Sequence, residues 1–180
     1  MKFKNALGLS LIFLFAAHFS FAQTAQFPIV KDYGGIYEIK DAVETPDPSL
    51  EYKIIVDMTT GADNPEAISR WVDNVARMMN LNGLAGVPKD RLHVKVVIHG
   101  SAIFTLLTDA NYQDRNKVDN PNLKVYDALL DAGAEIFVCG QSLIARDLVT
   151  SDLWPGVKIA HSALTTVTTY VPQGYTYLKF

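Results

Sequence analysis

The chain has a single cysteine, Cys139, at the end of an apolar run that starts at Ala134. A short apolar run of this kind, with Gly133 before it and Gly140 after it, is typical of a strand buried on both faces of a parallel sheet. Open α/β sheets bind ligands just outside the carboxyl ends of their strands, which is where Cys139 lies. The amides at the start of a following helix stabilise a thiolate and lower the pKa of the thiol. The pattern therefore predicts a reactive thiol, and the alternative is a buried, inert cysteine.

The four inner strands that we predict share a feature: each ends in a polar or reactive side chain. Because the carboxyl ends of parallel strands lie along one edge of a sheet, these side chains are predicted to meet around one pocket. Further ligand contacts in the pocket are expected from the segment after the cysteine, Gly140-Gln141-Ser142, where Ser142 is predicted to cap a helix that continues to about Leu148. The strand-end residues are Asp57 at the end of 52–57, His99 at the end of 91–99, Cys139 after the run 134–138, and His161 with Ser162 at the end of the strand that begins at Val157.

Two interpretations stay open for the histidines of this edge. His99 either pairs with Cys139 or an anion, or it forms a hydrogen bond with a loop carbonyl, and His161 has the same ambiguity. Asp57 is interpreted first as a cap for the loop after its strand and second as a pocket residue. A hydrolase with a Cys-His pair is conceivable, but no nucleophile-elbow or Cys-x-x-Cys motif is present.

The remaining segments alternate between strand and helix patterns. This alternation predicts a mainly parallel sheet of about five strands with helices on both faces, an α/β fold. Asn64-Pro65 is predicted to start a long helix, and Asn120-Pro121 a second one. The segment 109–119 is expected to be a polar loop. A helix capped by Ser162 and a last strand over 175–180 are predicted to close the chain.

Length and composition limit the classes of function. The 180 residues, 49% of them hydrophobic, suit one ordinary domain with a full core. A net charge of -3 without a basic stripe argues against nucleic acid as a partner. The single cysteine and scattered histidines form no zinc-ligand pattern, and no Walker or G-x-G-x-x-G loop is present, so we predict neither a metal nor a cofactor.

The first residues resemble an export signal. Lys2 and Lys4 form a positive start, residues 6–17 are apolar, and Ser20-Phe21-Ala22 offers a cleavage site. We therefore expect a signal peptide over residues 1–22, no stable membrane insertion after cleavage, and a periplasmic location in a two-membrane bacterium. The alternative is a retained anchor helix. Residues 23–50 are predicted to be an arm packed on the domain or on a neighbouring subunit, and residues 51–180 the domain itself.

Several motifs resemble the DsrE/DsrF-like family, most closely its exported branch with a Cys-Gly-Gln motif. They are Val97-Ile98-His99-Gly100, Asn120-Pro121-Asn122, Val138-Cys139-Gly140-Gln141-Ser142 and Gln173-Gly174-Tyr175. The resemblance spans roughly residues 52–178. It implies a three-layer α/β/α fold, assembly into homo-oligomers (trimers or hexamers), and a cysteine that carries sulfur as a persulfide and passes it to a partner protein.

Three hypotheses for function follow. The first is an exported sulfur-relay protein, in effect a sulfurtransferase, in which Cys139 accepts sulfane sulfur while His99 and the Gly140-Gln141 amides stabilise its charge. A sulfur donor and an acceptor protein would be its partners. The second is a non-catalytic module that binds a small ligand or partner at the same edge. The third is a thiol redox sensor.

Overall fold

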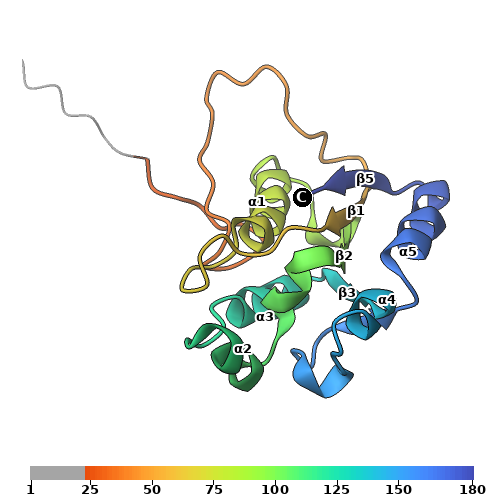
Figure 1. Ribbon diagram of the computed structural model, residues 1–180. Helices are drawn as coiled ribbons and strands as arrows, with labels where there is room; N and C mark the ends of the chain where they lie inside the picture. The colour runs from red at the N-terminus through yellow and green to blue at the C-terminus, as the bar shows by residue number, and fades with distance from the viewer. Residues whose placement is uncertain (1–22) are drawn as a thin grey trace, which may run out of the picture.

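The computed structural model describes residues 23–180, so the predicted signal peptide lies outside the described residues. In this part of the chain one sheet has five parallel strands in the order β4-β3-β2-β1-β5. Helices lie on both of its sides, so the fold is the predicted three-layer α/β/α arrangement (Figure 1). The strands are β1 (Tyr52–Met58), β2 (Leu92–Ile98), β3 (Glu135–Cys139), β4 (Lys158–Ala160) and β5 (Thr176–Lys179).

Short and long helices connect the strands. None of the helices between residues 23 and 180 has the length and hydropathy needed to span a bilayer. The α-helices are α1 (Arg70–Leu84), α2 (Asp109–Asn116), α3 (Leu123–Asp131), α4 (Gly140–Ile144) and α5 (Ala163–Tyr170). The 3-10 helices are η1 (Lys89–Arg91), η2 (Gly100–Leu106), η3 (Thr150–Asp152) and η4 (Val171–Gln173).

The strand order explains why the two faces of the sheet are covered unequally. From β1 to β4 each connection steps to the next strand in the same direction, and only the connection from β4 to β5 returns across the sheet. Because crossover connections are right-handed, the direction in which a connection moves along the sheet decides the face on which its helix lies. Connections that move in opposite directions place their helices on opposite faces. Accordingly α1 and α3 pack together on one face, here called the α1/α3 face, whereas α5 packs across β1 and β2 on the other, the α5 face.

The α1/α3 face holds the main core. Alternate residues of the inner strands point to it, and helix residues such as Val72, Met79 and Leu129 pack against them. The side chains of these three helix residues are completely buried. Each large apolar side chain buried in this way contributes about 1.5–3 kcal/mol. The strand residues of this face include Ile54, Val56, Met58, Val94, Val96, Ile98, Ile136 and Val138.

The α5 face mixes apolar and charged side chains. Ile55 and Val97 are buried beneath α5. Nearby Lys95, only 9% exposed, donates a hydrogen bond to Glu135 and lies 4.7 Å from the ring centroid of Tyr170. A single helix leaves part of this face open, which is why charged groups are tolerated there when they are paired.

Residues 23–36 pack against α1 through the buried side chain of Asn80. Its Oδ1 accepts hydrogen bonds from the amides of Ile29 and Val30 at 2.9 and 2.8 Å, and its Nδ2 donates to the carbonyls of Tyr33 and Gly34. Gly34 has φ +64°, and a Cβ there would lie 2.3 Å from the amide nitrogen of Arg77. The segment that follows, up to β1, arches away from the body of the molecule (Figure 1).

The helix predicted to begin at Asn64-Pro65 starts later. α1 begins at Arg70, with Ser69 as its N-cap, and Asn64 instead forms a local turn by accepting a hydrogen bond from the amide of Glu66. Two tertiary hydrogen bonds hold residues 65–69 out of the helix. Asn122 Oδ1 accepts from the amide of Ser69 at 2.8 Å, and Tyr112 Oη donates to the carbonyl of Pro65 at 3.0 Å.

The expected polar loop over 109–119 is also different, since most of it is helix α2. Thr108 caps α2 by accepting from the amide of Asn111, and Lys117 ends it in a left-handed conformation with φ 68°. Tyr112 is its one buried residue. A single apolar contact produces no helical periodicity, which is why the sequence did not indicate this helix.

Candidate functional site

Cys139 is the last residue of β3 and occupies the N-cap position of α4. The helix therefore begins at Gly140, directly after the cysteine, and the prediction that Ser142 caps it was wrong. Gly140 is favoured by close packing, because a Cβ there would lie 3.0 Å from the carbonyl oxygen of Ala160 on β4. This immediate strand-to-helix transition turns the first amides of α4 toward the cysteine sulfur.

The electrostatics around the sulfur favour the thiolate. Burial alone raises the pKa of the Cys139 thiol, but hydrogen bonds from the hydroxyl of Ser142 and from the backbone amides of Ala163, Ser142 and Gln141 outweigh it, so the pKa lies below its ordinary value. Ala163 is the first residue of α5, so amides from the starts of two helices converge on one sulfur. Their dipoles stabilise a negative charge there.

The sulfur is nevertheless well covered. Cys139 is 4% exposed and packs with Ile55, Val97 and Ala163 on the α5 face. Beside it, residues of α4 and β4 line an open, mostly apolar depression of about 550 Å³. Its lining includes Gly140, Gln141, Leu143, Ile144, Ile159 and His161.

His99 follows β2 at the position beside Cys139. The register pairs Ile98 with Val138, so the next residues on the two strands are His99 and Cys139. Side chains along a strand point alternately to the two faces of the sheet. Val97 and Cys139 share a cluster on the α5 face, whereas Ile98 and Val138 belong to the other face. His99, two residues after Val97, therefore points to the same face as Cys139. Neighbouring strands lie about 4.8 Å apart, so the backbone places His99 and Cys139 at adjacent strand ends on one edge of the sheet.

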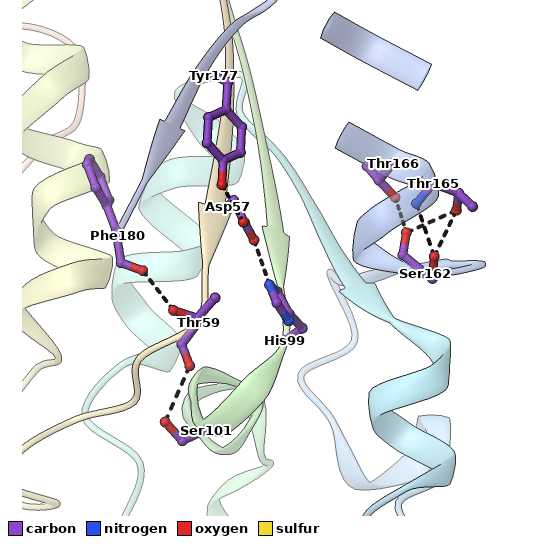
Figure 2. Close-up of polar contacts among 9 residues, drawn as sticks. All are labelled: Asp57, Thr59, His99, Ser101, Ser162, Thr165, Thr166, Tyr177 and Phe180. Atoms are coloured by element: carbon purple, nitrogen blue, oxygen red, sulfur yellow. Dashed lines mark hydrogen bonds and ion pairs between the residues drawn. The ribbon is translucent and has the colours of Figure 1, made fainter. Parts of the chain in front are cut away.

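The imidazole of His99 is held by a carboxylate. His99 Nε2 lies 2.6 Å from Asp57 Oδ1, and Tyr177 Oη donates to Asp57 Oδ2 at 2.7 Å (Figure 2). Asp57 lies within β1 and does not cap a loop, so the first interpretation of this residue was wrong. The ring of His99 forms its hydrogen bond with a side chain and not with a loop carbonyl. Tyr177 was missed, because its contact depends on β5 lying beside β1, which the sequence does not indicate.

The last two predicted site residues are less directly involved. Ser162 caps α5: its hydroxyl accepts from the amide of Thr165 at 3.0 Å, and its carbonyl accepts from the hydroxyl of Thr166 (Figure 2). The cap fixes the position of the Ala163 amide, so Ser162 acts on the sulfur through its helix. His161 is exposed and lines the depression beside Gly140.

Comparison with known protein families decides the classification. The profile of the DsrE/DsrF-like family matches residues 52–180, from β1 to the last residue. The chain belongs to the DsrE/DsrF-like family. The match includes every residue of the site described above, and a family of this kind indicates a function of the sulfur-relay type.

Solved structures of low sequence identity share the DsrE/DsrF-like fold. A protein of unknown function, MTH1491 from Methanobacterium thermoautotrophicum, is 17% identical, with a TM-score of 0.53 over 72% of this chain and 100% of its own. The ychN protein from E. coli is also 17% identical, with a TM-score of 0.51 over 71% of this chain and 99% of its own. A search among curated proteins finds no match.

Proposed function

We propose that Cys139 accepts sulfane sulfur as a persulfide and passes it to a thiol of a partner protein, which makes the chain a sulfurtransferase of the relay type. Family membership supports a role in sulfur handling. The observation that carries the assignment to Cys139 is its position as the last residue of β3 and the N-cap residue of α4, where the Ser142 hydroxyl and the neighbouring amides lower the pKa of its thiol. A thiolate is the nucleophilic form of cysteine, and by lowering the pKa of the thiol these donors increase the fraction of thiolate.

The loading step is a thiol exchange that needs no external oxidant. The thiolate of Cys139 attacks the outer sulfur of a persulfide or polysulfide donor. A bond forms between the two sulfurs, the donor's own S–S bond breaks, and the donor leaves as a thiolate that takes a proton from water. The resulting persulfide anion is stabilised by the same amide and hydroxyl donors, because it forms at the end of the same side chain.

Location and assembly belong to the same proposal. We place the protein outside the cytoplasm, in the periplasm of a two-membrane bacterium, on the basis of the signal-like pattern of residues 1–22 and the Cys-Gly-Gln motif of the exported branch. A homo-oligomer is supported by apolar side chains left exposed around the site. Ile144 is 74% exposed and Leu164 79%, and such groups gather at protein interfaces.

One observation favours the second hypothesis, a binding module. Cys139 is 4% exposed while the depression beside it is open and mostly apolar, as expected if a ligand or partner segment binds there and the thiol is structural. In that case the affinity for the ligand survives replacement of the cysteine.

Intact-protein mass spectrometry after treatment with inorganic polysulfide tests the proposal. We expect the mass of one sulfur atom to be added, removed again by a reducing agent, and absent from Cys139→Ala. An unmodified wild-type thiol under these conditions contradicts the relay function and favours the binding module. A sulfenic acid or an intermolecular disulfide formed with peroxide, without sulfur loading, would instead indicate a redox sensor.

A further inference from the structure

The carboxylate of Asp57 determines which nitrogen of His99 carries a proton. Both oxygens of Asp57 are engaged, one by His99 Nε2 at 2.6 Å and the other by the hydroxyl of Tyr177 at 2.7 Å (Figure 2). An ionised carboxylate only accepts hydrogen bonds, so Nε2 must be the donor. In the neutral ring Nδ1 then keeps its lone pair, and no side-chain or backbone group of residues 23–180 donates to it.

The contact is partly shielded from water. The side chain of Asp57 is 13% exposed and that of His99 27%. Shielding of this degree strengthens the hydrogen bond between His99 and Asp57 relative to bulk water, whereas the hydrogen bond from Tyr177 is exposed. Tyr177 remains a donor, because its hydrogen bond to Asp57 raises the pKa of the phenol.

We propose that Tyr177 and Asp57 are positioning residues that hold His99 with Nδ1 free, and that Nδ1 removes the proton of the acceptor thiol during sulfur transfer from Cys139. This inference rests on the proposed relay function and adds its second half-reaction. Cys139 Sγ supplies the sulfur at the neighbouring strand end, and the Tyr177–Asp57–His99 chain supplies the base.

The step balances without any other reagent. The acceptor thiol gives its proton to His99 Nδ1, and its sulfur attacks the outer sulfur of the Cys139 persulfide. A new S–S bond forms on the acceptor, the bond between the Cys139 sulfur and its outer sulfur breaks, and Cys139 leaves as a thiolate. Its amide and hydroxyl donors stabilise this leaving group. The imidazolium then returns its proton to water.

The terminal strand β5 is consequently part of the site. It pairs with β1, and Phe180 is tied to the loop after β1. The amide of Thr59 donates to the carbonyl of Phe180 at 3.1 Å, and the hydroxyl of Thr59 donates to the same carbonyl at 3.4 Å (Figure 2). This anchoring fixes Tyr177 beside Asp57. Tyr175, on the same terminal segment, instead stacks on Tyr170 with ring centroids 5.1 Å apart and offers a matched control.

The experiment compares two sulfur acceptors for the mature protein loaded with polysulfide. 2-Mercaptoethanol carries a proton that must be removed, whereas sulfite at mildly alkaline pH is largely a dianion and attacks the persulfide to give thiosulfate without a base. The rate with each acceptor is measured for wild type, Asp57→Asn, Tyr177→Phe and Tyr175→Phe. Dividing the thiol rate by the sulfite rate cancels any general loss of sulfur access or of thiolate stability.

We expect the ratio to fall about tenfold or more in Asp57→Asn, which is part of the roughly 10²–10⁴-fold contribution of a general base, because this variant keeps the imidazole and loses only its positioning. In Tyr177→Phe, which changes no charge, it should fall about threefold, the lower end of the effect of one hydrogen bond, because the bond from Tyr177 is exposed. Tyr175→Phe should leave it unchanged. In nitrogen NMR spectra of the wild type, the neutral His99 ring should show a proton on Nε2 and none on Nδ1.

An unchanged ratio in both Asp57→Asn and Tyr177→Phe, or a proton on Nδ1 in the wild type, overturns the inference. Equal losses with thiol and sulfite also overturn it, because they indicate a structural role. These results are distinct from failure of the proposed function, in which the wild-type protein does not load sulfur at all. If Asp57→Asn does not fold, Tyr177→Phe and the NMR spectrum decide.

Discussion

The two faces of the sheet differ in what their side chains do. On the α1/α3 face two helices cover the strands, and alternate residues from Ile54 to Val138 are apolar and buried. On the α5 face one helix of eight residues covers the same strands, and Lys95, Asp57, His99 and Cys139 lie there. The strand order therefore assigns stability to one face and chemistry to the other, because a single return crossover supplies a single covering helix.

Neighbouring residues of β3 provide the largest expected contrast. Ile136 is 1% exposed on the α1/α3 face, so Ile136→Ala should lower the free energy of unfolding by about 2–5 kcal/mol. Phe137 is only half-buried on the α5 face, so Phe137→Ala should cost about 1–2 kcal/mol, because little cavity is created. Urea unfolding of both variants measures the difference. Equal losses would contradict the division of the sheet into two unequal faces.

The caps of the covering helices are the next test. Ser69 caps α1 and Ser162 caps α5, and replacing either by alanine should cost about 1 kcal/mol. Only Ser162→Ala should also slow alkylation of Cys139 by iodoacetamide, because its helix presents the Ala163 amide to the sulfur. Ser69→Ala is therefore the matched control, and a similar loss of thiol reactivity in both variants would show that the effect is global.

Ser142→Ala should raise the pKa of Cys139 and slow its alkylation severalfold at neutral pH, because the thiolate loses a hydrogen bond. The pKa of this thiol is lower in the folded than in the unfolded state. Its thiolate therefore contributes stability above the ordinary thiol pKa, and this contribution is lost as the pH falls through the folded value. The stability gap between wild type and Ser142→Ala should accordingly widen with rising pH, and a constant gap would contradict the assignment.

The smallest effect is expected for the ion pairs at the open part of the α5 face. Hydrogen bonds from Lys158 and Lys95 lower the pKa of Glu135, so its carboxylate contributes stability above the ordinary carboxyl pKa that is lost as the pH falls through the folded value. Because the group is partly exposed, Glu135→Gln should cost at most about 1 kcal/mol at neutral pH and nothing in acid. Urea titrations at both pH values, with the exposed Glu66→Gln as control, measure this.

Much of the fold was predictable, because its signals are contiguous. Apolar runs identified all five strands, and Ser162 correctly indicated the start of α5. The position of Cys139 at a strand end before a helix also followed from Gly133 and Gly140 on either side of its run. Helix α2 was not predictable, because its one buried residue, Tyr112, produces no helical periodicity. The true start of α1 was not predictable, because Tyr112 and Asn122 determine it from outside the segment.

The sequence by itself determined which strands form and that a thiol, an imidazole and a carboxylate stand at their carboxyl ends. Only the tertiary structure decided how these groups combine. His99 forms a hydrogen bond with Asp57, which is 42 residues away in the sequence, and Asp57 forms one with Tyr177, which is 120 residues away. Both contacts exist because β2 and β5 pair with β1. Hydrogen bonds of such separation depend on strand order, which local propensities do not encode, and the same order brings the Ala163 amide to the sulfur of Cys139.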